Sequence, residues 1–120
     1  MREVCSNSLS AQFTSEDDFI ANKLLPELKI AAKELNIEDI LDFHKNVKIG
    51  TGWADVTVSK GGKNILVIEA KFKKKSGKVE RDIEPRDPDV LRQAVEYAAF
   101  GGYPFFATCN VNRLILFHHQ

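Results

Sequence analysis

The feature that most constrains the fold of this chain is a short apolar run that ends in two charged residues. The run Ile65–Ile68 is followed by Glu69, Ala70 and Lys71. A continuous apolar run of this length predicts a strand buried on both faces, at the centre of a sheet. Burying a carboxylate at the end of such a strand is costly unless it has a partner, and Lys71 leaves the same face of the strand as Glu69. The run therefore indicates both a sheet core and a polar site.

The remaining sequence predicts helices packed against this sheet. A first helix should begin at a Thr14 or Ser15 cap and end near Asn36, with Pro26 as a point where it would kink or divide. The other predicted elements are strands at about 44–49, 53–59 and 64–70, a helix at 89–100, and strands at 103–109 and 113–117. Residues 72–88 should form a long loop. The order α-β-β-β-α-β-β implies an α/β fold with a mixed sheet flanked by helices.

Length and composition are typical of one globular domain. The chain has 120 residues, of which 43% are hydrophobic and 28% charged, and this suits a single core. We expect a flexible lead-in at residues 1–13 and one domain at 14–120, either free-standing or a fragment of a larger protein. The sequence has no recognisable signal peptide and no run near the roughly 20 apolar residues of a membrane helix. With two widely separated cysteines, these features predict a cytoplasmic protein without membrane contact.

A second carboxylate is predicted to lie opposite Glu69. If the turn after the second strand consists of the three residues Gly61–Lys63, Lys60 faces Asn64 and Asp55 faces Glu69. Cross-strand neighbours have Cβ atoms roughly 5 Å apart, and two carboxylates that close repel each other unless a cation lies between them. A turn of even length would break this register. The hypothesis of a paired-carboxylate site depends on that turn.

Two interpretations of the pair remain open from the residues alone. In the simpler one, Lys71 forms a salt bridge with Glu69 or Asp55 and has no further role. That arrangement leaves one carboxylate uncompensated. Mg²⁺ prefers oxygen ligands and is typically held by one or two carboxylates together with water and substrate phosphate. Asp55 and Glu69 fit that description.

Three segments in order resemble the motifs of the PD-(D/E)XK nuclease superfamily. They are Gly52–Asp55, Ile65–Lys71 and Gln93–Tyr97, and a strand ending in Thr108–Asn110 follows them. The chain is most similar to the N-terminal nuclease domain of type I restriction subunits and related restriction proteins, over about residues 14 to 118. Ala54 stands where the motif proline is usually drawn. The resemblance implies a restriction-endonuclease-like core and a Mg²⁺-dependent endodeoxyribonuclease related to restriction.

The resemblance also implies roles for individual residues. Asp55 and Glu69 would bind Mg²⁺, or Mn²⁺ in its place, together with the backbone carbonyl of Ala70. Lys71 would orient or activate the attacking water and stabilise charge on the phosphate. Gln93 would be a catalytic residue that points at the active site or the DNA backbone.

Other charged residues are candidates beside this set. Glu16 matches an acidic residue at the start of the first helix in the family and would bind metal through water; the alternative is a helix-start acid stabilised by the helix dipole. The remaining candidates follow Lys71 in a basic stretch and are Lys73, Lys74, Lys75 and Lys78. A solvated loop has the same composition, but lysines beside a phosphodiester site are well placed for phosphate contacts.

We assign no function to several other reactive or aromatic side chains. Trp53 lies among strand residues and Cys109 in an apolar run, so we expect both in the core; stacking of Trp53 on a base is the alternative. His44, His118 and His119 show no convergent spacing, and we expect no catalysis from them.

Several functions are compatible with the sequence. The expected partner is DNA, with further domains or subunits of a restriction or helicase-type protein as additional partners. A junction-resolving nuclease acting as a homodimer, and a domain that binds nucleic acid without cutting it, are the alternatives.

Overall fold

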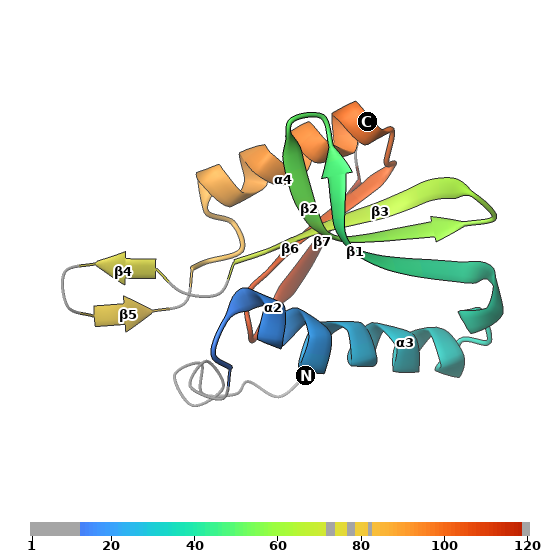
Figure 1. Cartoon of the computed structure of the whole chain (residues 1–120), viewed down its shortest axis with the longest axis horizontal. Helices are drawn as coiled ribbons and strands as arrows, with labels where there is room; N and C mark the ends of the chain where they lie inside the picture. The colour runs from blue at the N-terminus through green and yellow to red at the C-terminus, as the bar shows by residue number, and fades with distance from the viewer. Residues whose placement is uncertain (1–12, 72–73, 77–78, 82, 119–120) are drawn as a thin grey trace.

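A five-stranded mixed sheet lies between two helical layers in the computed structural model (Figure 1). The structure describes residues 13–71, 74–76, 79–81 and 83–118. Its helical elements are α2 (Glu16–Phe19), the π-helical turn η1 (Ile20–Leu24), α3 (Leu25–Glu34), the 3₁₀ turn η2 (Glu38–Ile40) and α4 (Pro88–Gly101). Its strands are β1 (Leu41–Ile49), β2 (Gly52–Lys60), β3 (Lys63–Ala70), β4 (Lys74–Ser76), β5 (Val79–Arg81), β6 (Phe105–Cys109) and β7 (Leu114–His118).

The strand order of the large sheet is β1-β2-β3-β6-β7, so β3 is the central strand, as its apolar run predicts. β1, β2 and β3 pair antiparallel, β3 and β6 pair parallel, and β6 and β7 pair antiparallel. The helix α4 makes the crossover between the two parallel strands. The prediction of a mixed α/β sheet with helices is thus confirmed. The element order differs from the prediction, because β4 and β5 form a separate two-stranded sheet where a loop was expected.

The first helix is continuous and passes through Pro26. Ser15 caps it, since its side chain accepts a hydrogen bond from the backbone N–H of Asp18 at 3.1 Å. Pro26 lies in the first turn of α3, directly after the π-helical turn η1. Proline lacks a backbone N–H and its ring crowds the preceding turn, so a wider turn at this point accommodates it. Of the two predicted outcomes at Pro26, a kink or a division of the helix, the division does not occur.

Two apolar clusters hold the helices to opposite faces of the sheet. The first joins the α2–η1–α3 layer to β3 and β6 and includes Phe19, Ile20, Val56 and Ile68. The second lies under α4 and is built from Ile49, Ala54, Val67, Ala94, Tyr97, Ala98, Tyr103 and Phe106. No helix in the described part of the chain is long and apolar enough to span a membrane.

The β2–β3 turn corrects the predicted loop and preserves the predicted register. The turn has two residues, Gly61 and Gly62, both with positive φ, and Lys60 pairs with Lys63 rather than facing Asn64. A β-bulge follows between Val58 and Ser59, and beyond it the pairing shifts by one residue. Such a bulge sets two residues of one strand against one of the other. Compared with a three-residue turn, the two-residue turn shifts the strand pairing by one residue, and the extra residue of the bulge shifts it back.

The β1–β2 hairpin bends at Asp55. The β1–β2 ladder is regular on both sides but has no pair between Asn46 and Asp55, and Asn46 has a φ of 53°. On one side of the gap Val56 packs under α2–α3, and on the other Ala54 packs under α4. Figure 1 shows both strands of this hairpin changing direction along their length. The bend therefore moves the hairpin tip from the sheet plane to the α4 layer, with Asp55 at the corner.

Candidate functional site

Asp55 and Glu69 meet at the end of the central strand, as the sequence predicts. The β2–β3 ladder places Val56 opposite Ile68, and the next pair in the same register is Asp55 and Glu69. The Oδ2 atom of Asp55 accepts a hydrogen bond from the backbone N–H of Ala70 at 2.7 Å. The Asp55 side chain thus takes the place of a backbone hydrogen bond of the β2–β3 ladder at the corner of the bent hairpin. The backbone of β3 holds this side chain in position.

Both carboxyl groups of the pair resist ionisation. Glu69 is 2% exposed, and burial together with the charge and hydrogen bond of Asp55 raises the pKa of Glu69 to about 9. Burial also raises the pKa of Asp55, although its hydrogen bonds with Glu69 and with the Ala70 N–H oppose the rise. A buried and a partly buried carboxyl group in hydrogen-bonding contact hold a proton between them more readily than two charges. A cation that replaced this proton would let both groups ionise.

Lys71 connects the buried pair to the surface. Its Nζ lies 3.9 Å from Oε2 of Glu69, and its side chain is 33% exposed. Its backbone N–H donates to the carbonyl of Cys109 at 2.9 Å, which extends the β3–β6 pairing to this residue. The lysine therefore has a fixed backbone and an ammonium group beside the carboxylates. A distance of 3.9 Å makes this a loose ion pair, which leaves Lys71 able to contact another anion.

One oxygen of Glu69 identifies where a cation would fit. Oε1 of Glu69 is buried and has no hydrogen-bond partner, a costly state for a carboxylate oxygen. No group of three or more His, Cys, Asp or Glu side chains among the described residues is arranged to hold a metal ion. The oxygen donors that the described side chains offer here are thus the two carboxyl groups of Asp55 and Glu69. This set fits Mg²⁺, which keeps several waters, better than a metal that requires an all-protein cage.

A cleft of about 590 Å³ opens beside Lys71. The described residues that line it are Glu16, Lys71, Ile83, Asp87, Asp89, Val90, Arg92, Gln93 and Glu96. The cleft thus brings Glu16 and Gln93 to Lys71 from α2 and α4, and the charge of Glu16 adds to the raised pKa of Glu69. Four of these residues are acidic and two basic, so attraction for a polyanion would need Lys71, Arg92 and a bound cation.

Gln93 is held in position by Tyr97. Its Nε2 donates to the Tyr97 Oη at 3.2 Å. Tyr97 is buried against β2, and a Cβ placed on Gly52 would overlap the Tyr97 hydroxyl. Only glycine at position 52 allows the hairpin to approach the tyrosine this closely. The two residues are four apart on α4 and therefore lie on the same face of the helix.

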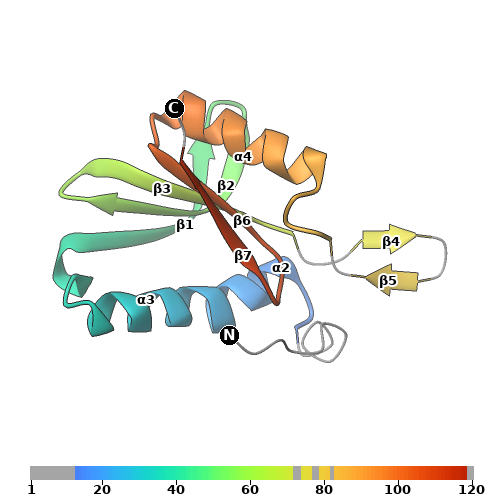
Figure 2. The ribbon, with the colours of Figure 1, turned by 180° about the vertical axis from the view of Figure 1, so that it is seen from behind.

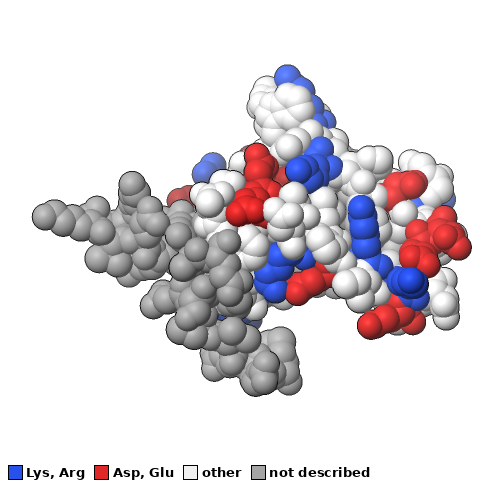
Figure 3. Space-filling view, turned by 60° about the horizontal axis from the view of Figure 1, so that its bottom comes forward, with Lys and Arg blue, Asp and Glu red and all other residues white. Residues whose placement is uncertain are grey.

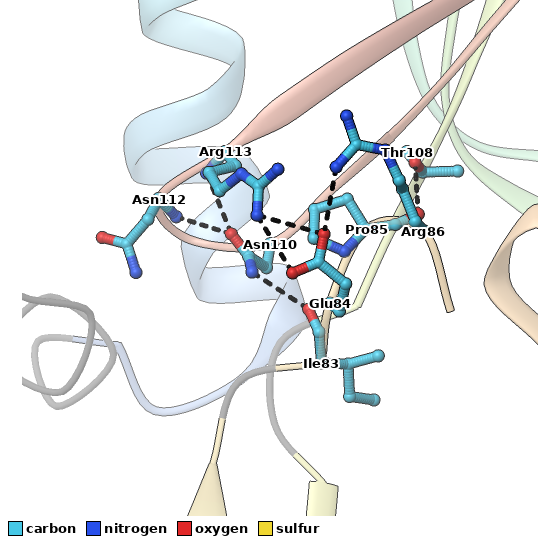
Figure 4. A network of polar contacts seen from close by, with 8 residues as sticks. All are labelled: Ile83, Glu84, Pro85, Arg86, Thr108, Asn110, Asn112 and Arg113. Atoms are coloured by element: carbon cyan, nitrogen blue, oxygen red, sulfur yellow. Dashed lines mark hydrogen bonds and ion pairs between the residues drawn. The ribbon is translucent and has the colours of Figure 1, made fainter. Parts of the chain in front are cut away.

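The segment after β5 is fastened to the end of β6, a feature that the sequence analysis missed (Figure 4). The Thr108 hydroxyl donates to the carbonyl of Pro85 at 2.7 Å, and the Asn110 side-chain amide donates to the carbonyl of Ile83 at 3.0 Å. The side-chain oxygen of Asn110 accepts a hydrogen bond from the backbone N–H of Arg113. The guanidinium group of Arg113 contacts the Glu84 carboxylate at 3.0 Å. Polar residues directly after an apolar strand were the available signal for such a network.

The predicted phosphate-binding lysines are only partly described. Lys73 and Lys78 lie outside the described residues. Lys74 and Lys75 belong to β4, whose backbone alone is described, and the β4–β5 hairpin stands apart from the sheet in both ribbon views (Figure 2). On the face shown in Figure 3, acidic and basic side chains are interspersed. The role of the lysines in nucleic-acid binding stays a prediction.

Two expectations about burial have opposite outcomes. Cys109 is 1% exposed, and burial raises the pKa of its thiol, as expected for a core residue that is no nucleophile. Trp53 is 58% exposed, so its assignment to the core is wrong. The reason is alternation along β2: Gly52 and Ala54 face α4, and Trp53 between them faces outward.

Comparisons with known protein families, with curated proteins and with solved structures found no match.

Proposed function

We propose that this domain has a restriction-endonuclease-like core and is a Mg²⁺-dependent endodeoxyribonuclease related to restriction. The observation that supports this most strongly is the buried Asp55–Glu69 pair, with Lys71 between it and an open cleft. A protein gains no stability from two neighbouring buried carboxyl groups. Their presence at the end of a rigid central strand is better explained by a ligand that needs them.

Three groups of this chain would hold the ion. They are the Asp55 carboxylate, the unpartnered Oε1 of Glu69 and the backbone carbonyl of Ala70. When bound, Mg²⁺ lowers the pKa of a coordinated water and polarises a phosphoryl oxygen. Asp55 is oriented by the Ala70 N–H, so its position does not depend on the ion.

The remaining residues act on the phosphate and the water. The Lys71 ammonium stabilises negative charge that develops on the phosphate, because it lies at the boundary between the buried pair and the cleft. Gln93, oriented by Tyr97, contributes an amide that contacts the attacking water or the strand backbone. Glu16 lines the same cleft and would contact the ion through water.

A salt bridge without further function explains the geometry less well. Lys71 is 3.9 Å from Glu69 and compensates one carboxylate at most. Glu69 Oε1 has no partner in that interpretation. A purely structural ion pair would satisfy its own oxygens.

Metal binding tests the proposal. Mg²⁺ and Mn²⁺ are titrated calorimetrically into the wild type, Asp55→Asn and Glu69→Gln, with Asp42→Asn on exposed β1 as the matched control. We expect both site variants to lose at least about tenfold in affinity and the control to bind like the wild type. Plasmid and branched DNA then report cleavage, which should fall about 100-fold or more in the site variants. Unchanged metal binding in both site variants would contradict the proposal, and metal binding without cleavage of either DNA would favour a non-cutting domain.

A further inference from the structure

Trp53 is an exposed aromatic side chain on a rigid support. It is 58% exposed, although the residues on either side of it are pressed against α4. Ala54 has no exposed surface, and Gly52 lies against the Tyr97 hydroxyl. The backbone of Trp53 is therefore fixed from one side, while its ring is held out on the opposite side of the hairpin. A large apolar ring kept in water by a rigid strand is a common feature of binding surfaces.

Lys48 adds a positive charge to this ring. The two residues are cross-strand partners in the β1–β2 ladder, and the Lys48 Nζ lies 5.6 Å from the centroid of the indole. Within the described part of the chain, Lys48 makes no ion pair. A flat aromatic ring beside an ammonium group matches the two parts of a nucleotide. The ring stacks on a base, and the ammonium attracts the adjoining phosphate.

The position of this pair relates it to the candidate site. Trp53 lies two residues before Asp55 on the same strand, a separation of about 7 Å between Cα atoms in extended chain. The hydrogen bond from the Ala70 N–H to the Asp55 side chain ties Asp55, and with it Trp53 on the same strand, to β3. A nucleic-acid strand with a phosphate at the Asp55–Glu69–Lys71 site would thus pass within reach of the indole.

We infer that Trp53 and Lys48 bind an unpaired nucleobase and its phosphate, next to the phosphate that occupies the Asp55–Glu69–Lys71 site. The occupant is a single-stranded stretch of nucleic acid. This inference rests on the proposed function and adds to it an unpaired nucleotide as part of the substrate. The stacking contact is tolerant of sequence, because every base has a flat face.

The chain carries its own probe for this contact, because Trp53 is its single tryptophan. The full chain is titrated with a short oligothymidylate in the presence of EDTA, which prevents cleavage, and with an abasic strand of equal length and charge. We expect the oligothymidylate to quench the fluorescence of Trp53 and the abasic strand to bind more weakly without quenching. Equal quenching by the two strands, or quenching by neither, would overturn the inference.

Binding of a labelled oligothymidylate, followed by anisotropy, compares the variants. Trp53→Leu should weaken binding about tenfold, and Lys48→Ala should weaken it less. Phe100→Leu is the matched control, because Phe100 is also an exposed aromatic, at 77%, and lies on α4; its affinity should equal that of the wild type. An equal loss in Trp53→Leu and Phe100→Leu would overturn the inference. Because EDTA is present, this outcome is independent of metal binding and of cleavage. If the metal titration fails, the fluorescence quenching still tests whether Trp53 contacts a base.

Discussion

The two ends of the β2–β3 hairpin differ in nearly every physical respect. At the turn, Gly61 and Gly62 are exposed, and a Cβ on either would meet no atom within 4 Å. At the other end, Glu69 is buried in the protein interior and the partly buried Asp55 lies against it. The two turn residues need only allow the chain to reverse direction. The buried end opposes folding, because its groups would be better hydrated in the unfolded chain, and this contrast separates what the hairpin needs for folding from what it holds for chemistry.

The largest effect should come from Glu69→Gln, which we expect to stabilise the metal-free protein. The folded-state pKa of Glu69 is about 9, above its ordinary value of 4.5. Folded protein thus keeps a proton that the unfolded chain has released, and stability falls as pH rises from about 4.5 to about 9. Glutamine mimics the protonated acid, so the variant should gain on the order of a few kcal/mol at pH 8 and lose the part of the pH dependence that Glu69 contributes. Urea unfolding with EDTA at pH 5 to 8 measures this, and parallel pH profiles for the two proteins would contradict it.

A smaller effect should separate two substitutions at Asp55. Asparagine keeps an acceptor for the Ala70 N–H, whereas alanine leaves this buried donor without a partner. Asp55→Ala should therefore be about 1–3 kcal/mol less stable than Asp55→Asn. Both substitutions remove the same charge beside Glu69, so their difference isolates the hydrogen bond. Equal free energies of unfolding would show that Asp55 does not support the backbone of β3.

The smallest effect belongs to the turn. Gly62 has a φ of 81°, and an alanine there should cost about 1 kcal/mol because of steric strain in the left-handed region. Gly61→Asn, at a φ of 56°, is the matched control and should be nearly neutral, since asparagine tolerates this conformation. Neither substitution should change Mg²⁺ affinity. A change in affinity would mean that the turn, and not the ladder beyond the bulge, determines the register of the carboxylates.

The register shows how far the sequence leads. A three-residue turn was predicted, and the structure has two residues in the turn and one in a bulge. Asp55 and Glu69 face each other in both cases, because the third turn residue of the prediction and the bulge residue of the structure shift the pairing by the same amount. The choice between them depends on local twist, which the run of β-branched and apolar residues does not reveal.

Neighbours in the strand were easier to predict than distant partners. Glu69 and Lys71 follow from the period of a strand, and the mixed sheet follows from the order of the elements. The outward position of Trp53 depends on the bend at Asp55 and on the left-handed Asn46, which no hydrophobic pattern encodes. The approach of Glu16 and Gln93 to Lys71 requires packing of both helical layers, and only the family resemblance suggested it before the structure.

The fastening of residues 83–86 has a consequence for how this domain can change. The segment between Lys71 and Ile83 begins at a hydrogen bond to Cys109 and ends at one from Asn110, so adjacent residues of the core secure its two ends. Lengthening a segment that is already closed costs little, about 0.6 kcal/mol for each doubling of its length. The β4–β5 hairpin can therefore be exchanged for a segment of different sequence or length at little cost in stability. Its length can change while the two hydrogen bonds at its ends keep the backbone beside Asp55, Glu69 and Lys71 in place.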